Sequence, residues 1–285
     1  MFKVSHVCLV TALSPGCMTR LKELTVTSPG DVGLFIPDIA VFSPSRLLVA
    51  DFYHGTLMLL DSVEDRTVSK VKLSTSPLRI CLLTDGRVVV TLDKMRKIQF
   101  CRVDGETLSL DRSIDVNIEG QGIAECDNGN LIVSCLNPPK VVMMTMDGQV
   151  IDEMDNEKAG KYLFSDPYFV ATSASGNIFV SNVCTKTIIQ MDRTLCTTRI
   201  FTSPMLTSPR GIVSVRPDQL LVADRDSNSI LILNPTSGEV TLLLGQADGI
   251  QSPWAVAWCT YNKKLYVGFV EYSKTLSVFC QKCLI

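Results

Sequence analysis

A short phrase returns six times along this chain of 285 residues, at a spacing of about 40 to 46 residues. In its fullest copy, an apolar run at residues 208–213 is followed by a turn, a second apolar run at 220–224, a polar loop and a third run at 229–234. Repeats of this length that contain several short strands are typical of β-propellers. The other five copies begin at Pro37, Ser76, Gln121, Asp166 and Ser252.

The turns and apolar runs within each copy predict the blades. A turn such as Asp85-Gly86 or Ser175-Gly176 separates the first two runs, which is a hairpin signal. The second run is continuously apolar, as at residues 47–50 and 220–223, and such a strand is expected to be covered on both faces. The sequence therefore predicts an all-β fold, a six-bladed β-propeller of four-stranded blades.

The two ends of the repeat region predict how the ring closes. Only six residues follow Phe279, too few for a turn and a complete outer strand of the last blade. Residues 21–27 alternate apolar and polar side chains before the first copy, so we expect them to supply that strand and hide the sheet edges. We expect residues 1–17 to be a short, poorly ordered leader, 18–280 to be the propeller and 281–285 to be a tail.

Composition favours an intracellular protein that neither spans a membrane nor is drawn to nucleic acid by its net charge. The net charge is −2, so no global field draws the chain to nucleic acid or to an anionic membrane, and no apolar run is long enough to span a bilayer. There are eleven cysteines, an odd number, and no glycosylation sequon. These features favour a reducing, cytoplasmic location with no disulfide-linked partner. The CxxC at residues 280–283 has no second ligand pair nearby, so we interpret it as two free thiols.

The repeat phrase resembles the NHL repeat. Residues 208–212, 221–224 and 228–230 form the copy most similar to it, with Pro-x-Gly-Ile on the inner strand and Val-Ala-Asp before the polar loop. The order of features from Met18 to Phe279 also resembles the C-terminal propeller of invertebrate, molluscan-type tripartite-motif proteins. That resemblance implies a domain that recognises the substrates of a ubiquitin ligase, or RNA.

Ligase chemistry itself cannot be carried over from this resemblance. In tripartite-motif proteins it belongs to a RING, which needs about eight Cys and His ligands in paired spacing. This chain has two histidines, His6 and His54, and only Cys8 and Cys17 near its start. We therefore expect a non-catalytic binding module, a relative that lacks the RING and the B-boxes, with no cofactor.

One end of the disc is the expected binding face. The loop after the second strand of each blade and the entry to its inner strand should emerge there together. Arginines and aromatic residues gather at these positions, and both types dominate binding hot spots. The candidate residues are Tyr53, His54, Arg79, Lys94, Arg96, Tyr168, Lys186, Arg210, Arg225 and Trp254.

The charges at these positions favour a protein or peptide partner over RNA. Acidic residues accompany the basic ones, whereas tracking phosphates requires an excess of Lys and Arg. RNA stays an alternative, through local bases and stacking rings. We expect the charges of Arg96 and Arg210 to be exposed and to contribute little to folding. Asp51 and Asp224 are expected to cap loop amides, and Trp254 either packs between blades or binds the partner.

A second alternative is a calcium-dependent lactonase or esterase. Some six-bladed propellers hold calcium at the axis with a Glu, an Asn and an Asp from different blades. Asn182 and Asp224 occupy suggestive strand ends, but the first blade opens 36–39 without the Glu-Gly-Pro entry that would supply a third ligand. Two histidines and no Gly-x-Ser-x-Gly do not support a hydrolase triad. We therefore expect neither a metal nor catalysis.

Overall fold

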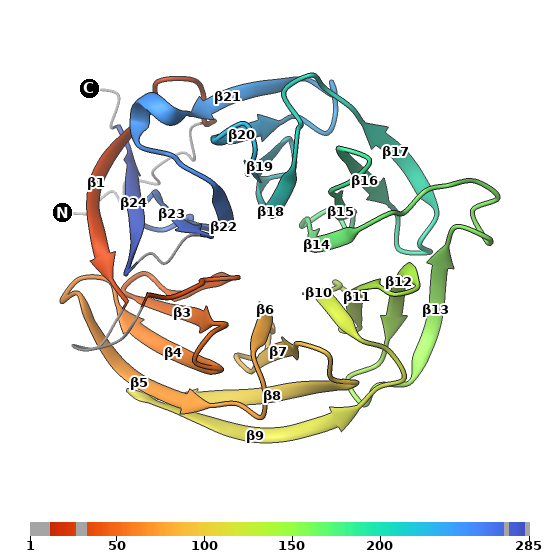
Figure 1. The fold of residues 1–285 in the computed structure, drawn as a ribbon, viewed down its shortest axis with the longest axis horizontal. Coiled ribbons are helices and arrows are strands. Elements are labelled where there is room, and N and C mark those ends of the chain that lie inside the picture. The colour runs from red at the N-terminus through yellow and green to blue at the C-terminus, as the bar shows by residue number, and fades with distance from the viewer. Residues whose placement is uncertain (1–11, 27–32, 271–273, 283–285) are drawn as a thin grey trace, which may run out of the picture.

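Six antiparallel sheets of four strands each surround a central axis in the computed structural model of the chain (Figure 1). The structure describes residues 12–26, 33–270 and 274–282. Each sheet is one blade, and the strand order runs outward from the axis in chain order in the first five blades. The predicted all-β, six-bladed propeller is confirmed.

The strands follow one another blade by blade. Blades one and two contain β2 (Ile39–Ser43), β3 (Arg46–Asp51), β4 (Thr56–Asp61), β5 (Arg66–Lys72), β6 (Pro77–Leu82), β7 (Val88–Leu92), β8 (Lys97–Asp104) and β9 (Thr107–Asp115). Blades three and four contain β10 (Gly120–Glu125), β11 (Leu131–Leu136), β12 (Pro139–Met144), β13 (Val150–Asp155), β14 (Pro167–Thr172), β15 (Ile178–Asn182), β16 (Thr187–Met191) and β17 (Thr197–Phe201). Blades five and six contain β18 (Pro209–Arg216), β19 (Gln219–Asp224), β20 (Ser229–Leu233), β21 (Val240–Leu244), β22 (Pro253–Cys259), β23 (Lys264–Phe269), β24 (Thr275–Gln281) and β1 (Met18–Thr25), with a short 3-10 turn η1 (Gln246–Asp248) between β21 and β22.

The ring is closed by β1, as predicted. This strand is the outer strand of the sixth blade and pairs antiparallel with β24, from Met18 opposite Gln281 to Thr25 opposite Thr275. The amide of Val26 extends the pairing by donating to the Lys274 carbonyl at 2.9 Å. Thr27, the last residue of the predicted closing strand, lies outside the described residues.

The core is divided among the six junctions between neighbouring blades. The described buried side chains form six clusters, and each joins residues of two adjacent sheets. In β3, Leu47 and Val49 pack toward blade six, whereas Leu48 and Ala50 pack toward blade two. This explains the continuously apolar second run, because both faces of each sheet are covered.

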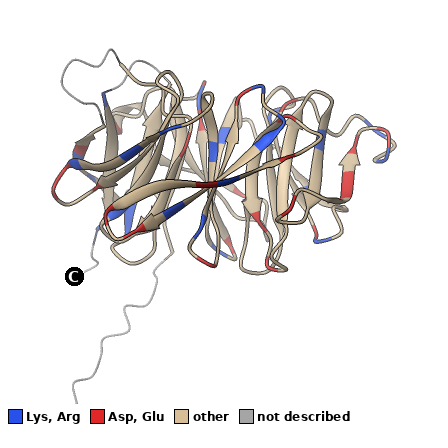
Figure 2. Cartoon of the chain, turned by 90° about the horizontal axis from the view of Figure 1, so that it is seen from below, with Lys and Arg blue, Asp and Glu red and all other residues tan. Residues whose placement is uncertain are grey.

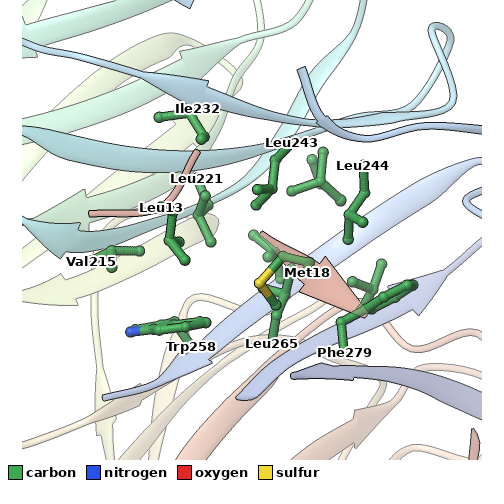
Figure 3. Packing of buried hydrophobic residues seen from close by; sticks show 14 of the residues in the cluster. Leu13, Met18, Val215, Leu221, Ile232, Leu243, Leu244, Trp258, Leu265 and Phe279 are labelled. Atoms are coloured by element: carbon green, nitrogen blue, oxygen red, sulfur yellow. The ribbon is translucent and has the colours of Figure 1, made fainter. Parts of the chain in front are cut away.

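One residue of the predicted leader, Leu13, is buried against the propeller. Leu13 is 3% exposed and joins the cluster between blades five and six, near Met18 and Trp258 (Figure 3). Its amide donates to Gln219 Oε1 at 2.9 Å, and Gln219 Nε2 donates back to its carbonyl at 2.8 Å. One apolar side chain and two hydrogen bonds thus hold residue 13 against the propeller, and the leader over residues 1–17 stays a prediction. Residues 1–11 lie outside the description, as do 283–285 of the predicted tail.

The disc has two distinct ends. We call the end where each inner strand begins and each second strand ends the entry face, and the end that carries turns such as 84–87 and 260–263 the turn face.

Lys and Arg are interspersed with Asp and Glu around the molecule (Figure 2). The nine cysteines within the described residues are all free thiols. None of the described helical segments is long and apolar enough to cross a bilayer.

Candidate binding site on the entry face

Three equivalent side chains anchor the loops of the entry face. Asp51, Asn182 and Asp224 each end the second strand of a blade and are buried. Asp224 accepts hydrogen bonds from the amides of Thr207 and Ser208 at 2.8 and 3.0 Å. Because a buried carboxylate with several donors is well satisfied, its role here is to fix the backbone of the loops.

The same anchoring accounts for His54 and for Asn182. His54 Nδ1 lies 2.7 Å from Asp51 Oδ2, and its amide also hydrogen-bonds that carboxylate at 3.2 Å. Asn182 Oδ1 accepts from the amides of Ser165 and Asp166, and its Nδ2 donates to the Leu163 carbonyl at 2.8 Å. The predicted capping role of Asp51 and Asp224 is therefore confirmed.

These contacts bear directly on the calcium alternative. The oxygens of Asn182 and Asp224 that would bind a cation already accept backbone hydrogen bonds. Within the described residues, no group of three or more His, Cys, Asp or Glu side chains is arranged to hold a metal ion. The chemistry of the available donors thus does not fit a calcium site at this position.

Aromatic rings from three blades meet near the axis on the entry face. The ring of Phe35 lies 5.2 Å from that of Trp254, edge to face, and 5.5 Å from that of Phe52. Trp254 also meets Tyr168 edge to face at 5.6 Å. Tyr53 extends the cluster outward, 6.1 Å from Phe35, and is 53% exposed. Such geometry is favourable for aromatic pairs and makes this part of the face rigid.

Two arginines stack on these rings. The guanidinium carbon of Arg210 lies 4.3 Å from the ring centre of Trp254 and 4.7 Å from that of Tyr168. Arg79 lies 3.6 Å from the ring centre of Phe169 and 5.4 Å from that of Tyr168. Tyr168 therefore contacts both guanidinium groups, which are attracted to the ring faces.

Arg79 is a buried cation close to the axis, with a carboxyl beside it. It is 2% exposed, and its Nη1 donates to the carbonyls of Pro37 and Leu78 at 3.2 and 2.6 Å. Burial lowers the pKa of Arg79 to about 10, against the opposing attraction of Asp38. Burial raises the pKa of Asp38 to about 6, although Arg79 and the amides of Ile80 and Ile39 lower it in part.

Two cavities lie at either side of Arg79. One, which we call the entry cavity, has a volume of about 210 Å³ and is lined mainly by rings and apolar side chains with Arg79, Asp93 and Gln121. The other, the axial cavity, measures about 240 Å³ and is lined by residues of all six inner strands. Asp38 and Trp258 contribute polar groups to the axial cavity. The guanidinium of Arg79 thus separates the axis from the entry face.

The ten predicted site residues divide into two groups. Arg79, Tyr168, Arg210 and Trp254 are brought together at the axis. Four of the others are exposed around them: Tyr53, Lys94, Arg96 and Lys186. The last two, His54 and Arg225, are partly exposed. Lys186 has a φ of 57° and occupies the turn position that Gly55 and Asn228 occupy in other blades. No described contact joins the exposed lysines to the axial group.

Burial of Arg210 corrects one expectation. This residue is 8% exposed, not a surface charge, because the rings of Tyr168 and Trp254 cover its guanidinium. Burial accordingly lowers its pKa. Trp254 is also 8% exposed, so it packs between blades and at the same time lines the entry cavity.

Three further residues of this site were not predicted from the sequence: Phe35, Phe169 and Asp38. Phe169 directly follows Tyr168 and Asp38 directly follows Pro37, so both stand where the inner strand begins. Phe35 lies two residues before Pro37, and its carbonyl accepts the Phe52 amide at 3.0 Å. Considering the whole entry segment of each blade, instead of its first residue, would have found all three.

Comparison with known proteins supports the fold and leaves the family open. No protein-family model matches the chain, and no curated protein matches it in sequence. Similar solved structures include virginiamycin B lyase from Staphylococcus aureus, at 18% identity over 87% of this chain and 80% of that chain, with a TM-score of 0.64. A streptogramin B lyase structure matches at 13% identity over 92% and 97%, with a TM-score of 0.67. A chain of a nidogen/laminin complex matches at 15% identity over 79% and 85%, with a TM-score of 0.63.

At these identities the likeness shows the propeller fold alone. The similar structures include a lyase and a complex of two proteins, so the fold by itself is compatible with catalysis and with binding. Function must therefore be argued from the side chains of the entry face.

Proposed function

We propose that this chain is a partner-recognition module that binds a protein or peptide on its entry face, as the substrate-recognition propeller of a tripartite-motif-type ubiquitin ligase relative would. The observation that carries the proposal is the cluster of rings and arginines at the axis, surrounded by exposed Tyr53 and partly exposed Arg225. Rigid aromatic anchors and arginines are the residues that contribute most to protein interfaces.

The distribution of charge supports a protein partner over RNA. Acidic side chains such as Asp93 and Asp226 lie beside the basic ones, and Arg225 Nη1 is 3.7 Å from Asp226 Oδ1. A phosphate backbone would be repelled by these carboxylates, whereas a protein surface with both signs of charge would be complementary to them. RNA is retained as an outcome of the test, since Lys94, Arg96 and Lys186 are exposed on the same face.

The test is capture of partners from cell extract by the intact propeller, with and without ribonuclease. The double variant Tyr53→Ala/Arg225→Glu changes two accessible residues of the entry face. The matched control Tyr261→Ala/Arg193→Glu makes the same changes on the turn face, where Tyr261 is 81% exposed and Arg193 pairs with Asp127.

We expect the entry-face variant to lose most of the captured protein and the turn-face variant to retain it, with ribonuclease making no difference. Both variants should melt within a few degrees of the wild type, since accessible side chains contribute little to folding. Loss of capture in the control alone would place binding on the turn face. Loss on ribonuclease treatment, together with a steep dependence on salt, would replace the protein partner by RNA.

A further inference from the structure

The guanidinium groups of Arg79 and Arg210 have unused hydrogen-bond donors. Nε and Nη2 of Arg79, and Nε of Arg210, are buried and have no acceptor among the described residues. No carboxylate lies within ion-pair distance of either group in the described part of the chain. A buried donor without an acceptor is unfavourable, so these atoms indicate where an acceptor from outside would bind.

The free atoms of Arg79 form one edge of its guanidinium. Nη1 is held by two backbone carbonyls, and Phe169 lies 3.6 Å from the guanidinium carbon, so the group is fixed in orientation. Nε and Nη2 are the pair that presents two parallel N–H bonds to a carboxylate. The pKa of Arg79 is lowered by burial and, to a smaller extent, by the charge of Arg210. An anion between them would offset that repulsion.

The entry cavity supplies the rest of a ligand site. Its walls include the rings of Phe35, Tyr168 and Trp254, and its volume of about 210 Å³ is that of a small organic group. Arg210 stacks against two of those rings. The cavity therefore combines an apolar, aromatic wall with the cation of Arg79, and the second cation, Arg210, contacts two of the rings in that wall.

We propose that the entry cavity binds a carboxylate attached to an apolar group, with the carboxylate between Arg79 and Arg210 and the apolar group against Phe35 and Trp254. This inference rests on the proposed function and names the chemistry of the group that enters deepest. The free edge of Arg79 is shielded from solvent, so ligand entry requires neighbouring side chains to shift, and half-buried Tyr168 contacts both arginines. The carboxylate belongs either to the C-terminus of a peptide or to a small organic acid.

A carboxylate fits this site better than a phosphate. Asp93 lines the same cavity and Asp38 lies just beyond Arg79, so a second negative charge on the ligand would be repelled. The mostly apolar lining also leaves few donors for the additional oxygens of a phosphate.

The first experiment compares charged and neutral probes on the wild-type chain by isothermal titration calorimetry at pH 7.5. The probes are 3-phenylpropionate and its amide, which share their apolar group and differ in the carboxylate. We expect the acid to bind at least about tenfold more tightly, since hydrogen bonds to a charged group contribute about 1.5–3 kcal/mol. Equal affinities, no binding of the acid, or equally tight binding of inorganic phosphate would overturn the inference.

Variants then locate the site. Arg210→Gln should weaken binding of 3-phenylpropionate about tenfold or more, and Arg79→Lys, which keeps the charge and loses the two-pronged edge, should weaken it as well. Arg102→Gln on β8, an exposed arginine paired with Asp111, is the matched control and should bind like the wild type. Unchanged affinity in a folded Arg210→Gln or Arg79→Lys variant would refute the placement.

Two further probes identify the source of the carboxylate and separate this inference from the proposed function. The peptide Gly-Gly-Gly-Gly-Phe is titrated with a free and with an amidated C-terminus; preference for the free form indicates a peptide terminus, and binding of 3-phenylpropionate alone indicates a small acid. Partner capture that is unaffected by 3-phenylpropionate, while the acid binds the cavity, would leave the cavity assignment intact and count against the proposed function. Capture that depends on Tyr53 and Arg225, with no binding of any carboxylate, would support the proposed function and refute the cavity assignment.

Discussion

Replacing Asp38 by Asn should change how stability depends on pH. Burial raises the pKa of Asp38 from 3.8 to about 6, against the lowering effects of Arg79 and two backbone amides. The folded chain therefore holds this proton more tightly than the unfolded chain does. The stability that Asp38 contributes is fully present below about pH 4 and is lost as the pH rises to about 6.

The size of the effect follows from the two pKa values. At about 1.4 kcal/mol for each pH unit, the difference between 3.8 and about 6 corresponds to about 3 kcal/mol. The free energy of unfolding of the wild type, taken relative to that of Asp38→Asn, should thus fall by about 2–3 kcal/mol between pH 4 and pH 7. Asn fails to reproduce some hydrogen bonds, such as the one from the Ile80 amide at 2.8 Å. Their loss changes the difference in unfolding free energy by the same amount at every pH, so it does not alter the pH dependence.

Urea unfolding followed by tryptophan fluorescence measures both proteins at each pH. Asp192→Asn is the control, because the hydrogen bond from Thr194 lowers the pKa of Asp192 and reverses the sign. There the wild type should lose stability relative to the variant as the pH falls. A difference curve for Asp38→Asn that is flat, or that rises with pH, would refute the assignment of a half-buried, proton-retaining carboxyl at the axis.

Three more changes test the fold and the site. Removing residues 1–26 should lower the melting temperature strongly and promote aggregation, whereas removing residues 283–285 should leave it nearly unchanged, because only the first deletion exposes the edge of β24. Gly211→Ala should destabilise by about 1–3 kcal/mol in urea unfolding, since its new Cβ would lie 2.8 Å from the Trp254 carbonyl; Gly245→Ala, with its nearest contact at 3.6 Å, should be close to neutral. Asn182→Ala and Asp224→Ala should each lower the melting temperature through the loss of loop hydrogen bonds, and calcium-stimulated hydrolysis of lactones or aryl esters that these variants abolish would instead support the enzyme alternative.

The sequence was most informative where one rule applied to every blade. Alternation at residues 21–25 and apolar runs such as 220–223 followed from the pleat and from burial on two faces, so β1 and β19 were predictable. The cap that Asp224 forms over the loop after it was predictable for a similar reason, because the Ser227 amide that donates to it is only three residues away. Leu13 carried no such signal, since a single apolar residue outside the repeat has no period.

The axial cluster shows what a repeat cannot reveal. Positions in the phrase predicted that four residues lie at the entry face, and the structure has them there: Arg79, Tyr168, Arg210 and Trp254. Their contacts, however, join blades two, four, five and six across the axis. The repeat period gives no information about which side chains point toward the axis. Burial of the two arginines depends on the size of the rings opposite them, and only the closed ring brings those rings within reach.

Pairing of β1 with β24 has a consequence for how the chain is made. Glu23 accepts a hydrogen bond from Thr275, 252 positions later in the sequence. At a synthesis rate of about 5–20 residues per second, β1 leaves the ribosome some tens of seconds before its partner strand exists. During that interval β1 and the growing stack of blades have unpaired edges, and the ring forms only once β24 has been made. A β1 strand that meets the sixth blade of a neighbouring nascent chain first would complete that blade instead, so crowded polysomes should favour strand-exchanged dimers of this protein.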